Sequence, residues 1–180
     1  MKRWFALSAI GKDRPGIVAD LAELVYDCRC NLEDSSMTIL GSEFAVLLLL
    51  TGEGADLDRR LADAAKHLEW EKRLTVFIRP LDGEPIRYSV GKEAQPYELQ
   101  ATGVDKAGLV ARVARCLAKH GATITQMFTH SRPEPESGTP IYTMDIRLDI
   151  PSGVSEETVR NDLDAIAADL NIETELRRER

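Results

Sequence analysis

The sequence predicts an α+β protein made of two similar units in tandem, each with the element order β-α-β-β-α-β. An internal repeat is the first reason: residues 101–111 repeat residues 9–19 at a constant offset of 92. Alternating apolar and polar residues in short runs, typical of half-buried strands, are the second. Helical apolar patterns, two in each half, are the third. This order folds into a four-stranded antiparallel sheet with both helices on one face, the ferredoxin-like arrangement.

The first unit covers residues 1–80. Short apolar runs separated by turn residues predict its strands, and apolar spacings of three and four residues predict its helices. In chain order we expect strand 4–10, helix 14–28, strand 31–40, a turn at Gly41 and Ser42, strand 43–51, a helix over 57–68 and strand 74–79.

Residues 81–96 contain two glycines and two prolines without a clear period, which is typical of a linker. Within this linker Ile86, Tyr88 and Val90 alternate and could form a short extra strand.

The second unit covers residues 97–180 and follows the same order. The offset rises from 92 to 98 at its third strand, where Tyr142 aligns with Phe44, so its hairpin is six residues longer. In chain order we expect strand 97–102, a helix from Leu109 that Gly121 ends, strand 123–131, a loop over 132–140, strand 141–150, a helix capped by Ser155 and strand 172–177.

The composition excludes some partners. The chain of 180 residues has a net charge of −7 and a pI of about 5.1. Nucleic-acid affinity depends largely on Lys and Arg that neutralise phosphates, so direct DNA or RNA binding is not expected. The apolar run 44–50 is too short to cross a membrane. The start resembles a signal peptide faintly, but the repeat assigns residues 4–10 to a strand, and we expect a cytoplasmic protein.

The three cysteines form no framework for structural disulfides. The pair Cys28 and Cys30 could be redox-active. The pattern favours a packing role instead, with Cys28 in the helix core and Cys30 at the start of the next strand, because free cysteine packs as a small hydrophobic residue.

No catalytic constellation stands out, and we predict a protein that is not an enzyme and carries no cofactor or metal. His67, His120 and His130 are scattered, and none has a partner at metal-ligand spacing. Glu33 and Asp34 are adjacent in a predicted strand, so they should point to opposite faces, which does not suit paired acid–base catalysis.

The turn between the first strand and the first helix is the main candidate site. Asp13 is placed to cap the helix, and Pro15 suits its first turn because proline has no amide hydrogen to lose. Gly16 lets a ligand approach the backbone, and we expect its φ to be helical. A helix N-terminus with bare backbone suits a carboxylate or a phosphate. The alternative is an ordinary well-capped helix start.

Polar residues gather where the second strand begins: Asn31, Glu33, Asp34, Ser35 and Ser36. We expect this strand start to lie close to the turn. The amides of residues 14–17 could then hold a carboxylate while Asn31 or Asp34 takes an ammonium group, which suits a free amino acid. The alternative is a solvated loop.

The turn over residues 13–18 and the stretches 30–34 and 40–44 resemble the glycine cleavage system transcriptional repressor family of tandem ACT-domain proteins. The resemblance implies amino-acid binding against the first turn of the helix. It also implies that the protein lacks a DNA-binding domain and modulates an activator protein. Carried over by position, it implies Asp13, Arg14, Gly16, Ile17 and Asn31 as ligand-binding residues. With Pro15 and Asp34, they make up the predicted ligand site.

The second copy departs from this pattern. Ala107 replaces Pro15, Thr123 replaces Asn31, and Gln126 replaces Asp34, which makes a second ligand site doubtful. Such a second site would be formed by Asp105, Lys106, Gly108 and Leu109.

We therefore predict a regulatory protein that senses a small amino acid such as glycine and acts on a transcriptional activator or another protein partner. One alternative is an ACT pair that serves as a protein-interaction module without a ligand. The other is a small ferredoxin-like enzyme.

The outer faces of the two sheets are predicted to differ. In the second copy the outward positions are polar: Glu98, Gln100, Asp145, Arg147, Glu173 and Glu175. The matching positions of the first copy are largely apolar: Ala6, Ser8, Ile10, Leu47, Leu49, Thr75 and Phe77. Large exposed apolar patches usually mark interfaces. We expect the same face of a second chain to cover this one in a homodimer, with the linker around Tyr88 as the alternative cover.

Overall fold

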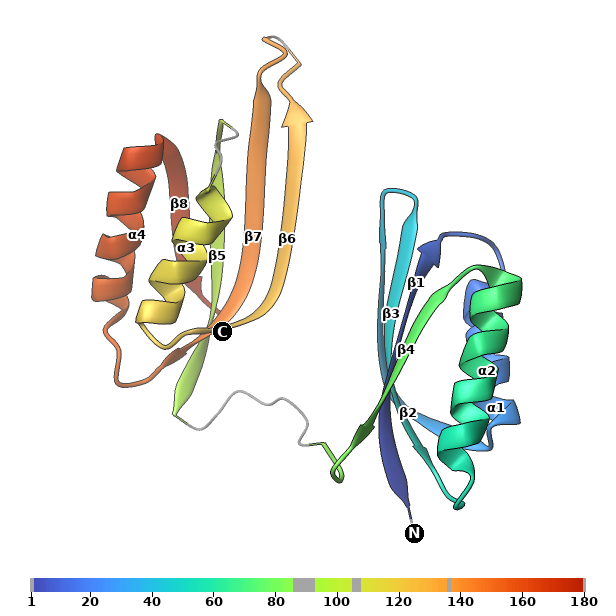
Figure 1. Ribbon diagram of the computed structural model, residues 1–180. Helices are drawn as coiled ribbons and strands as arrows, with labels where there is room; N and C mark the ends of the chain where they lie inside the picture. Colours follow the sequence, from blue (N-terminus) through green and yellow to red (C-terminus); the bar gives the residue numbers. More distant parts are fainter. Residues whose placement is uncertain (1, 86–92, 105–107, 136, 180) are drawn as a thin grey trace. The chain divides into compact units, whose positions relative to one another are not determined.

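The computed structural model describes residues 2–85, 93–104, 108–135 and 137–179. The chain divides into two compact units, residues 1–87 and 88–180, which we call the first and second domain. Each has the order β-α-β-β-α-β, with a four-stranded antiparallel sheet and both helices on one face (Figure 1). The predicted α+β ferredoxin-like tandem is therefore confirmed.

The first domain has the sheet order β2-β3-β1-β4. Because β3 pairs antiparallel with both β1 and β2, β1 and β2 run in the same direction. Its elements are β1 (Arg3–Lys12), α1 (Ile17–Asp27), β2 (Cys30–Leu40), β3 (Glu43–Gly52), α2 (Leu57–Lys72) and β4 (Thr75–Leu81).

The second domain repeats this topology with the sheet order β6-β7-β5-β8. Its elements are β5 (Ala94–Val104), α3 (Leu109–Lys119), β6 (Thr123–Pro133), β7 (Pro140–Pro151), α4 (Glu156–Leu170) and β8 (Ile172–Arg178). The predicted linker 81–96 is shorter at both ends, since β4 includes Leu81 and β5 begins at Ala94. The extra strand predicted around Ile86, Tyr88 and Val90 lies outside the described residues.

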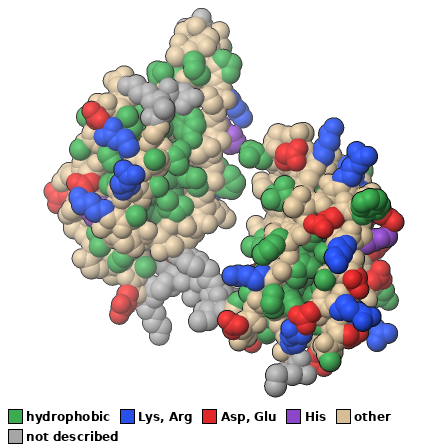
Figure 2. Space-filling model, in the orientation of Figure 1, with side chains coloured by type: hydrophobic (Ala, Val, Ile, Leu, Met, Phe, Trp, Pro, Cys, Tyr) green, Lys and Arg blue, Asp and Glu red, His purple; other side chains and the backbone are tan. Residues whose placement is uncertain are grey.

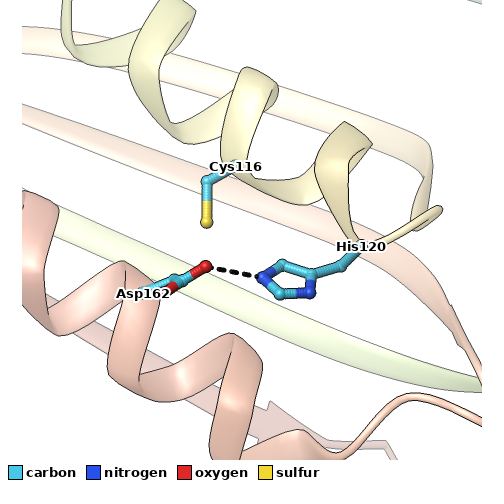
Figure 3. Close-up of side chains that lie close together, drawn as sticks. All are labelled: Cys116, His120 and Asp162. Atoms are coloured by element: carbon cyan, nitrogen blue, oxygen red, sulfur yellow. Dashed lines mark hydrogen bonds and ion pairs between the residues drawn. The ribbon is translucent and has the colours of Figure 1, made fainter.

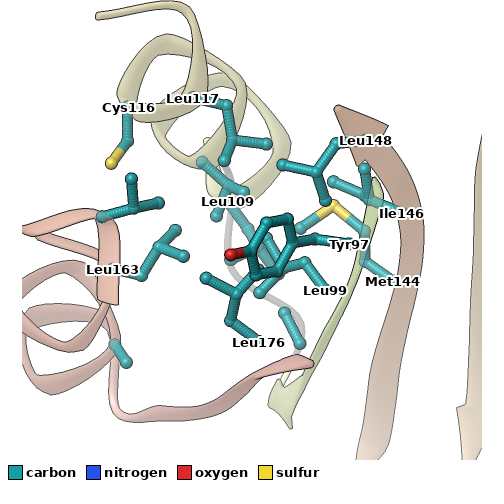
Figure 4. Close-up of a cluster of buried hydrophobic side chains, with 14 of the residues drawn as sticks. Tyr97, Leu99, Leu109, Cys116, Leu117, Met144, Ile146, Leu148, Leu163 and Leu176 are labelled. Atoms are coloured by element: carbon teal, nitrogen blue, oxygen red, sulfur yellow. The ribbon is translucent and has the colours of Figure 1, made fainter. Parts of the chain in front are cut away.

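Each domain has its own hydrophobic core between sheet and helices. In the second domain Tyr97, Leu99 and Leu176 from the sheet pack with Leu117 and Leu163 from the helices (Figure 4). All the residues predicted to face the helices there are buried: Tyr97, Leu99, Met144, Ile146, Leu148, Ile172 and Leu176. The alternation of the sequence therefore located the core face correctly.

The helix starts differ from the prediction. Helix α1 begins at Ile17, not at Arg14, and its N-cap residue is Gly16 with φ 86°. No side chain caps the helix, so Asp13 is not the cap, and the expected helical φ of Gly16 is wrong. Gly108 has the same conformation before α3, with φ 92°. A left-handed backbone disfavours every residue with a Cβ, which explains a glycine in both copies.

Two other predicted helix ends are closer to the structure. Ser155 is the N-cap residue of α4, although its side chain makes no capping hydrogen bond. Gly121 follows the end of α3 with φ 67°, the left-handed conformation that commonly ends a helix. Among the described residues, no helix is both long and apolar enough to span a membrane.

Both edge strands carry a β-bulge at the same place in the repeat. The register of β2 shifts between Leu32 and Asp34, and that of β6 shifts between Ile124 and Gln126. The Glu33 carboxylate accepts a hydrogen bond from the Thr51 hydroxyl. Asp34 lies opposite Leu49, and Leu49 and Thr51 are on the same face of the sheet, so Glu33 and Asp34 share that face. The expectation that Glu33 and Asp34 point to opposite faces is therefore wrong, because the bulge inserts one extra residue.

The outer sheet faces differ as predicted. In the first domain Leu47, Phe77 and Ile10 are 55%, 64% and 52% exposed. In the second domain the outward side chains are polar or charged and bonded to one another: Arg147 donates to the Glu98 carboxylate at 3.3 Å and to the Gln126 side-chain oxygen at 3.3 Å.

Candidate functional site

The turn from β1 to α1 is short and exposed. Asp13, Pro15 and Gly16 are exposed, while the side chain of Ile17 is buried in the core. The Asp13 amide donates to the Ser42 carbonyl at 2.8 Å, which ties the turn to the β2–β3 hairpin. The first amides of a helix have no acceptor within the helix, and no side chain caps α1. An end of this kind suits a small anion, because it offers backbone amides and the positive end of the helix dipole.

The Arg14 side chain is already engaged by other groups beside the helix start. Its guanidinium forms an ion pair with Asp20 on the first turn of α1, and its Nη1 donates to the Pro15 carbonyl at 3.4 Å. Lys72 at the end of α2 bonds the other Asp20 oxygen at 3.3 Å. The hydrogen bond from Arg14 lowers the pKa of Asp20, and Lys72 adds to this effect. Asp20 thus stays ionised, and Arg14 must leave this ion pair before it can bind an anion.

Asn31 and Asp34 do not lie at this turn. The register places Asn31 opposite Thr51, which pairs with Trp4, whereas the turn follows Lys12 at the other end of β1. Eight residues of strand separate the two places, roughly 26 Å. The expectation that the start of β2 lies close to the turn is therefore wrong. The reason is topological: a right-handed crossover to a parallel strand returns the chain to the end where β1 began.

Asn31 instead belongs to a polar depression at the β1 start, lined by Lys2, Arg29, Asn31, Glu33, Thr51, Gly52 and Glu53. Thr51 donates to Glu33 at 2.6 Å, and Lys2 lies 3.1 Å from the same carboxylate oxygen. Hydrogen bonds from Thr51, Lys2 and Asn31, in that order, lower the pKa of Glu33 to about 2. Asp34 accepts the Ser35 amide at 2.8 Å on the neighbouring stretch of β2.

The second copy keeps part of the turn. Gly108 and Leu109 take the places of Gly16 and Ile17, with the same left-handed glycine and the same buried first helical residue. Asp105 and Lys106 lie outside the described residues.

One group of side chains was missed in the sequence. Cys116, His120 and Asp162 offer donor atoms that all lie within 4.8 Å of one another. The statement that no histidine has a suitably spaced partner is therefore wrong for His120. Cys116 precedes it by four residues, which puts both on one face of a helix, and this spacing was the available signal. Asp162 comes from α4, so only the tertiary structure supplies it.

Comparison with known proteins agrees with the fold. The family model described as "ACT domain" matches residues 4–78, almost all of the first domain. The chain is a tandem ACT-domain protein. It is 36% identical over 63 residues to UPF0237 protein MJ1558 of Methanocaldococcus jannaschii, covering 35% of this chain and 68% of that protein. The second ACT domain has the same topology as the first.

Two further similarities cover both ACT domains. The glycine cleavage system transcriptional repressor of Escherichia coli K12 is 25% identical over 184 residues, which is 94% of this chain and 87% of that protein. A crystal structure of an unknown protein from Galdieria sulphuraria has a TM-score of 0.82 at 26% identity and covers all of both chains. The tandem arrangement itself is thus shared with these proteins.

Proposed function

We propose that this chain is a non-enzymatic regulatory protein that senses a small amino acid, with glycine as the first candidate, and passes that state to a protein partner. The observation that carries this proposal is the similarity to a glycine cleavage system transcriptional repressor along 94% of the chain. The acidic net charge of −7 supports action through a protein, such as a transcriptional activator, and not through DNA.

The β1–α1 turn of the first domain is the proposed ligand site. The uncapped amides of α1 suit the carboxylate of an amino acid, and the exposed Asp13 carboxylate suits its ammonium group. Pro15, Gly16 and the backbone of Ile17 would form the floor, and Arg14 would contribute if its ion pair with Asp20 opens.

Asn31 and Asp34 cannot reach the same ligand within one domain, because roughly 26 Å separates Asn31 from the turn and an amino acid is far shorter. Asn31 remains a proposed ligand residue only for the polar depression at the other end of β1, whose lining does not include Asp34. A ligand there would find the Lys2 and Arg29 cations and the Glu33 carboxylate. The second turn, with Asp105, Lys106, Gly108 and Leu109, is proposed as a weaker site.

A thermal-shift screen of the full chain against the twenty amino acids tests this function. A ligand that binds only the folded protein raises the midpoint of thermal unfolding, by an amount that grows with ligand concentration. We expect one small amino acid to do so. Asp13→Asn should remove the shift if the ligand lies at the turn, and Asn31→Ala should leave it unchanged. The reverse pattern would move the site to the polar depression.

The absence of a shift with every amino acid would contradict amino-acid sensing. It would favour the second candidate, a protein-interaction module without a ligand. The apolar outer face of the first domain is the observation that favours this candidate.

We further propose that the protein is a homodimer in which this face covers the same face of a second copy. The face spans at least three strands, with Ile10 on β1, Leu47 on β3 and Phe77 on β4, and all three side chains are more than half exposed. A flat apolar face is complementary to itself, and two-fold pairing is the commonest way to bury such a surface.

A further inference from the structure

We propose that Cys116, His120 and Asp162 form a binding site for one Zn²⁺ ion between α3 and α4 of the second domain. The three side chains converge on the space between two helices, with Cys116 in the last turn of α3, His120 as the C-cap residue of α3, and Asp162 on α4 facing them (Figure 3). Their donor atoms all lie within 4.8 Å of one another, and His120 Nε2 is 3.0 Å from Asp162 Oδ2.

The three donors are held to different degrees. Cys116 is 7% exposed and packs in the hydrophobic core, and the His120 side chain is 10% exposed. Both are therefore restricted to few conformations. The Asp162 side chain is 38% exposed and lies at the rim, so it can adjust its position and leaves a path for an ion from solvent.

The donor set suits zinc. A thiolate sulfur, an imidazole nitrogen and a carboxylate oxygen are its three usual protein ligands, at about 2.3, 2.0 and 2.1 Å. Tetrahedral coordination at those lengths places neighbouring donors roughly 3.3 to 3.7 Å apart. The observed His120–Asp162 distance of 3.0 Å is close to that range, and the longest separation must contract by about 1 Å. Three protein ligands leave the fourth position to water or another small ligand.

One cation competes for the site. Lys119 Nζ lies 3.0 Å from the same Asp162 oxygen that His120 contacts. The Lys119 side chain is 72% exposed, so its ammonium group can turn to solvent when a dication takes its place. Cys116, Lys119 and Asp162 line a surface recess together with Arg112, which is already paired with Asp169 on α4. Arg115 also lines the recess and makes the site less favourable for a dication than its donors alone suggest.

The first domain provides an internal contrast at the equivalent positions. The buried residues of the helices align at offsets of 92 for α1 with α3 and 102 for α2 with α4. Cys116 therefore corresponds to Leu24, His120 to Cys28 and Asp162 to Arg60. The Arg60 guanidinium donates to the Cys28 carbonyl at 2.8 Å, so a cation of the protein itself occupies the seam between the helices. The first domain closes this seam without a metal, and the second presents three metal donors there.

Titration of the full chain, stripped with a chelator, with Co²⁺ tests the proposal. Cobalt(II) takes the place of zinc and reports its ligands, because thiolate coordination gives a sulfur-to-cobalt charge-transfer band and tetrahedral coordination gives intense d–d bands. We expect one equivalent to bind with both signals and Zn²⁺ to displace it. Cys116→Ser should abolish the charge-transfer band. Asp162→Asn should weaken binding at least about tenfold, as removal of even an outer-shell partner commonly does.

Cys30→Ser and His130→Gln are the matched controls, since each removes a cysteine or histidine outside the cluster, and neither should change the spectrum. Urea unfolding checks that each variant folds, and His120→Gln gives a second ligand variant if Cys116→Ser is unstable. The absence of a charge-transfer band in the wild type, or its persistence in Cys116→Ser, would overturn the proposal. The cluster would then be a hydrogen-bonded clip between the two helices.

Discussion

The two ACT domains have the same topology and matching cores, yet their outer sheet faces have opposite character. Leu47 and Phe77 of the first domain are exposed apolar side chains, and the matching positions of the second domain are Asp145 and Glu175. Where the first face could meet an apolar partner, the second has hydrogen-bonded polar side chains, such as the Gln100 amide, which donates to Asp145 at 2.9 Å. The fold requires apolar residues on the sheet face that packs against the helices. The residues of the outer face are not restricted in this way and can differ according to what each domain contacts.

The charges elsewhere on the first domain are mixed. Figure 2 shows Lys, Arg, Asp and Glu side chains interspersed with hydrophobic ones on the visible face of that domain, the body on the right. Alternating charges of this kind suit a solvated surface. The two domains therefore differ at two specific places, the outer sheet face and the seam between the helices. Substitutions at each place can test the difference.

The largest expected effect is the loss of the dimer when Leu47 of the first domain is replaced by aspartate, the residue at the matching position of the second domain. Leu47→Asp places a carboxylate on the apolar face, and burying an unpaired charge in a dimer interface is strongly unfavourable. We expect sedimentation to change from dimer to monomer while the circular dichroism spectrum stays unchanged. Asp145→Leu, the reverse exchange in the second domain, is the control and should leave the dimer intact. A wild type that sediments as a monomer would contradict the dimer.

The second prediction concerns the feature that both domains share. Gly16 and Gly108 have φ values of 86° and 92°, so valine at either position must adopt a left-handed backbone. Each substitution should lower the free energy of unfolding of its own domain by about 1–3 kcal/mol. Urea unfolding of the full chain measures this. Gly153→Val, at a described glycine where an added Cβ meets no neighbour and φ is not left-handed, is the control.

Equal losses in the free energy of unfolding at Gly16 and Gly108 would mean that both glycines are needed for the left-handed backbone conformation. An amino-acid affinity lost in Gly16→Val therefore cannot by itself identify a ligand site, which is why the ligand screen relies on Asp13→Asn instead.

The smallest expected effect is a difference in acid stability between the two bulges. Glu33 occupies the bulge of β2, and the matching residue of β6 is Thr125, which does not titrate. The folded-state pKa of Glu33 is about 2, below the ordinary 4.5. A lowered folded-state pKa stabilises the fold above the ordinary value, and this contribution is lost as the pH falls from about 4.5 towards 2.

Glu33→Gln should therefore flatten the pH dependence of unfolding in that window and leave the second domain unaffected. Urea unfolding at a series of pH values measures the change, and a Glu33 carboxyl signal that titrates near 4.5 in NMR would contradict it. Glu53→Gln, at a carboxylate in the same depression, is the control.

Several site residues were misplaced in the sequence interpretation for reasons that lie in three dimensions. Asn31 and the turn at Asp13 are both next to α1 in sequence, but they mark its two ends, and the parallel direction of β1 and β2 keeps them roughly 26 Å apart. Gly16 was expected in the helix, but a repeat of a glycine cannot distinguish a helical φ from a left-handed one. The bulge at Glu33 cannot be recognised in the sequence, because this strand is too polar to show a clear alternation of apolar and polar residues.

The sequence by itself determined the repeat, the order of the elements, the residues that face the helices and the contrast between the two outer faces. These follow from local periodicity, because a strand alternates every two residues and a helix repeats every 3.6. Only the tertiary structure decided which ends of the elements meet, and so which polar residues can share a ligand. Cys116 and His120 are one helical turn apart in sequence, but Asp162 reaches them only because α4 packs beside α3. Contacts of that kind depend on packing between distant segments, which no local pattern encodes.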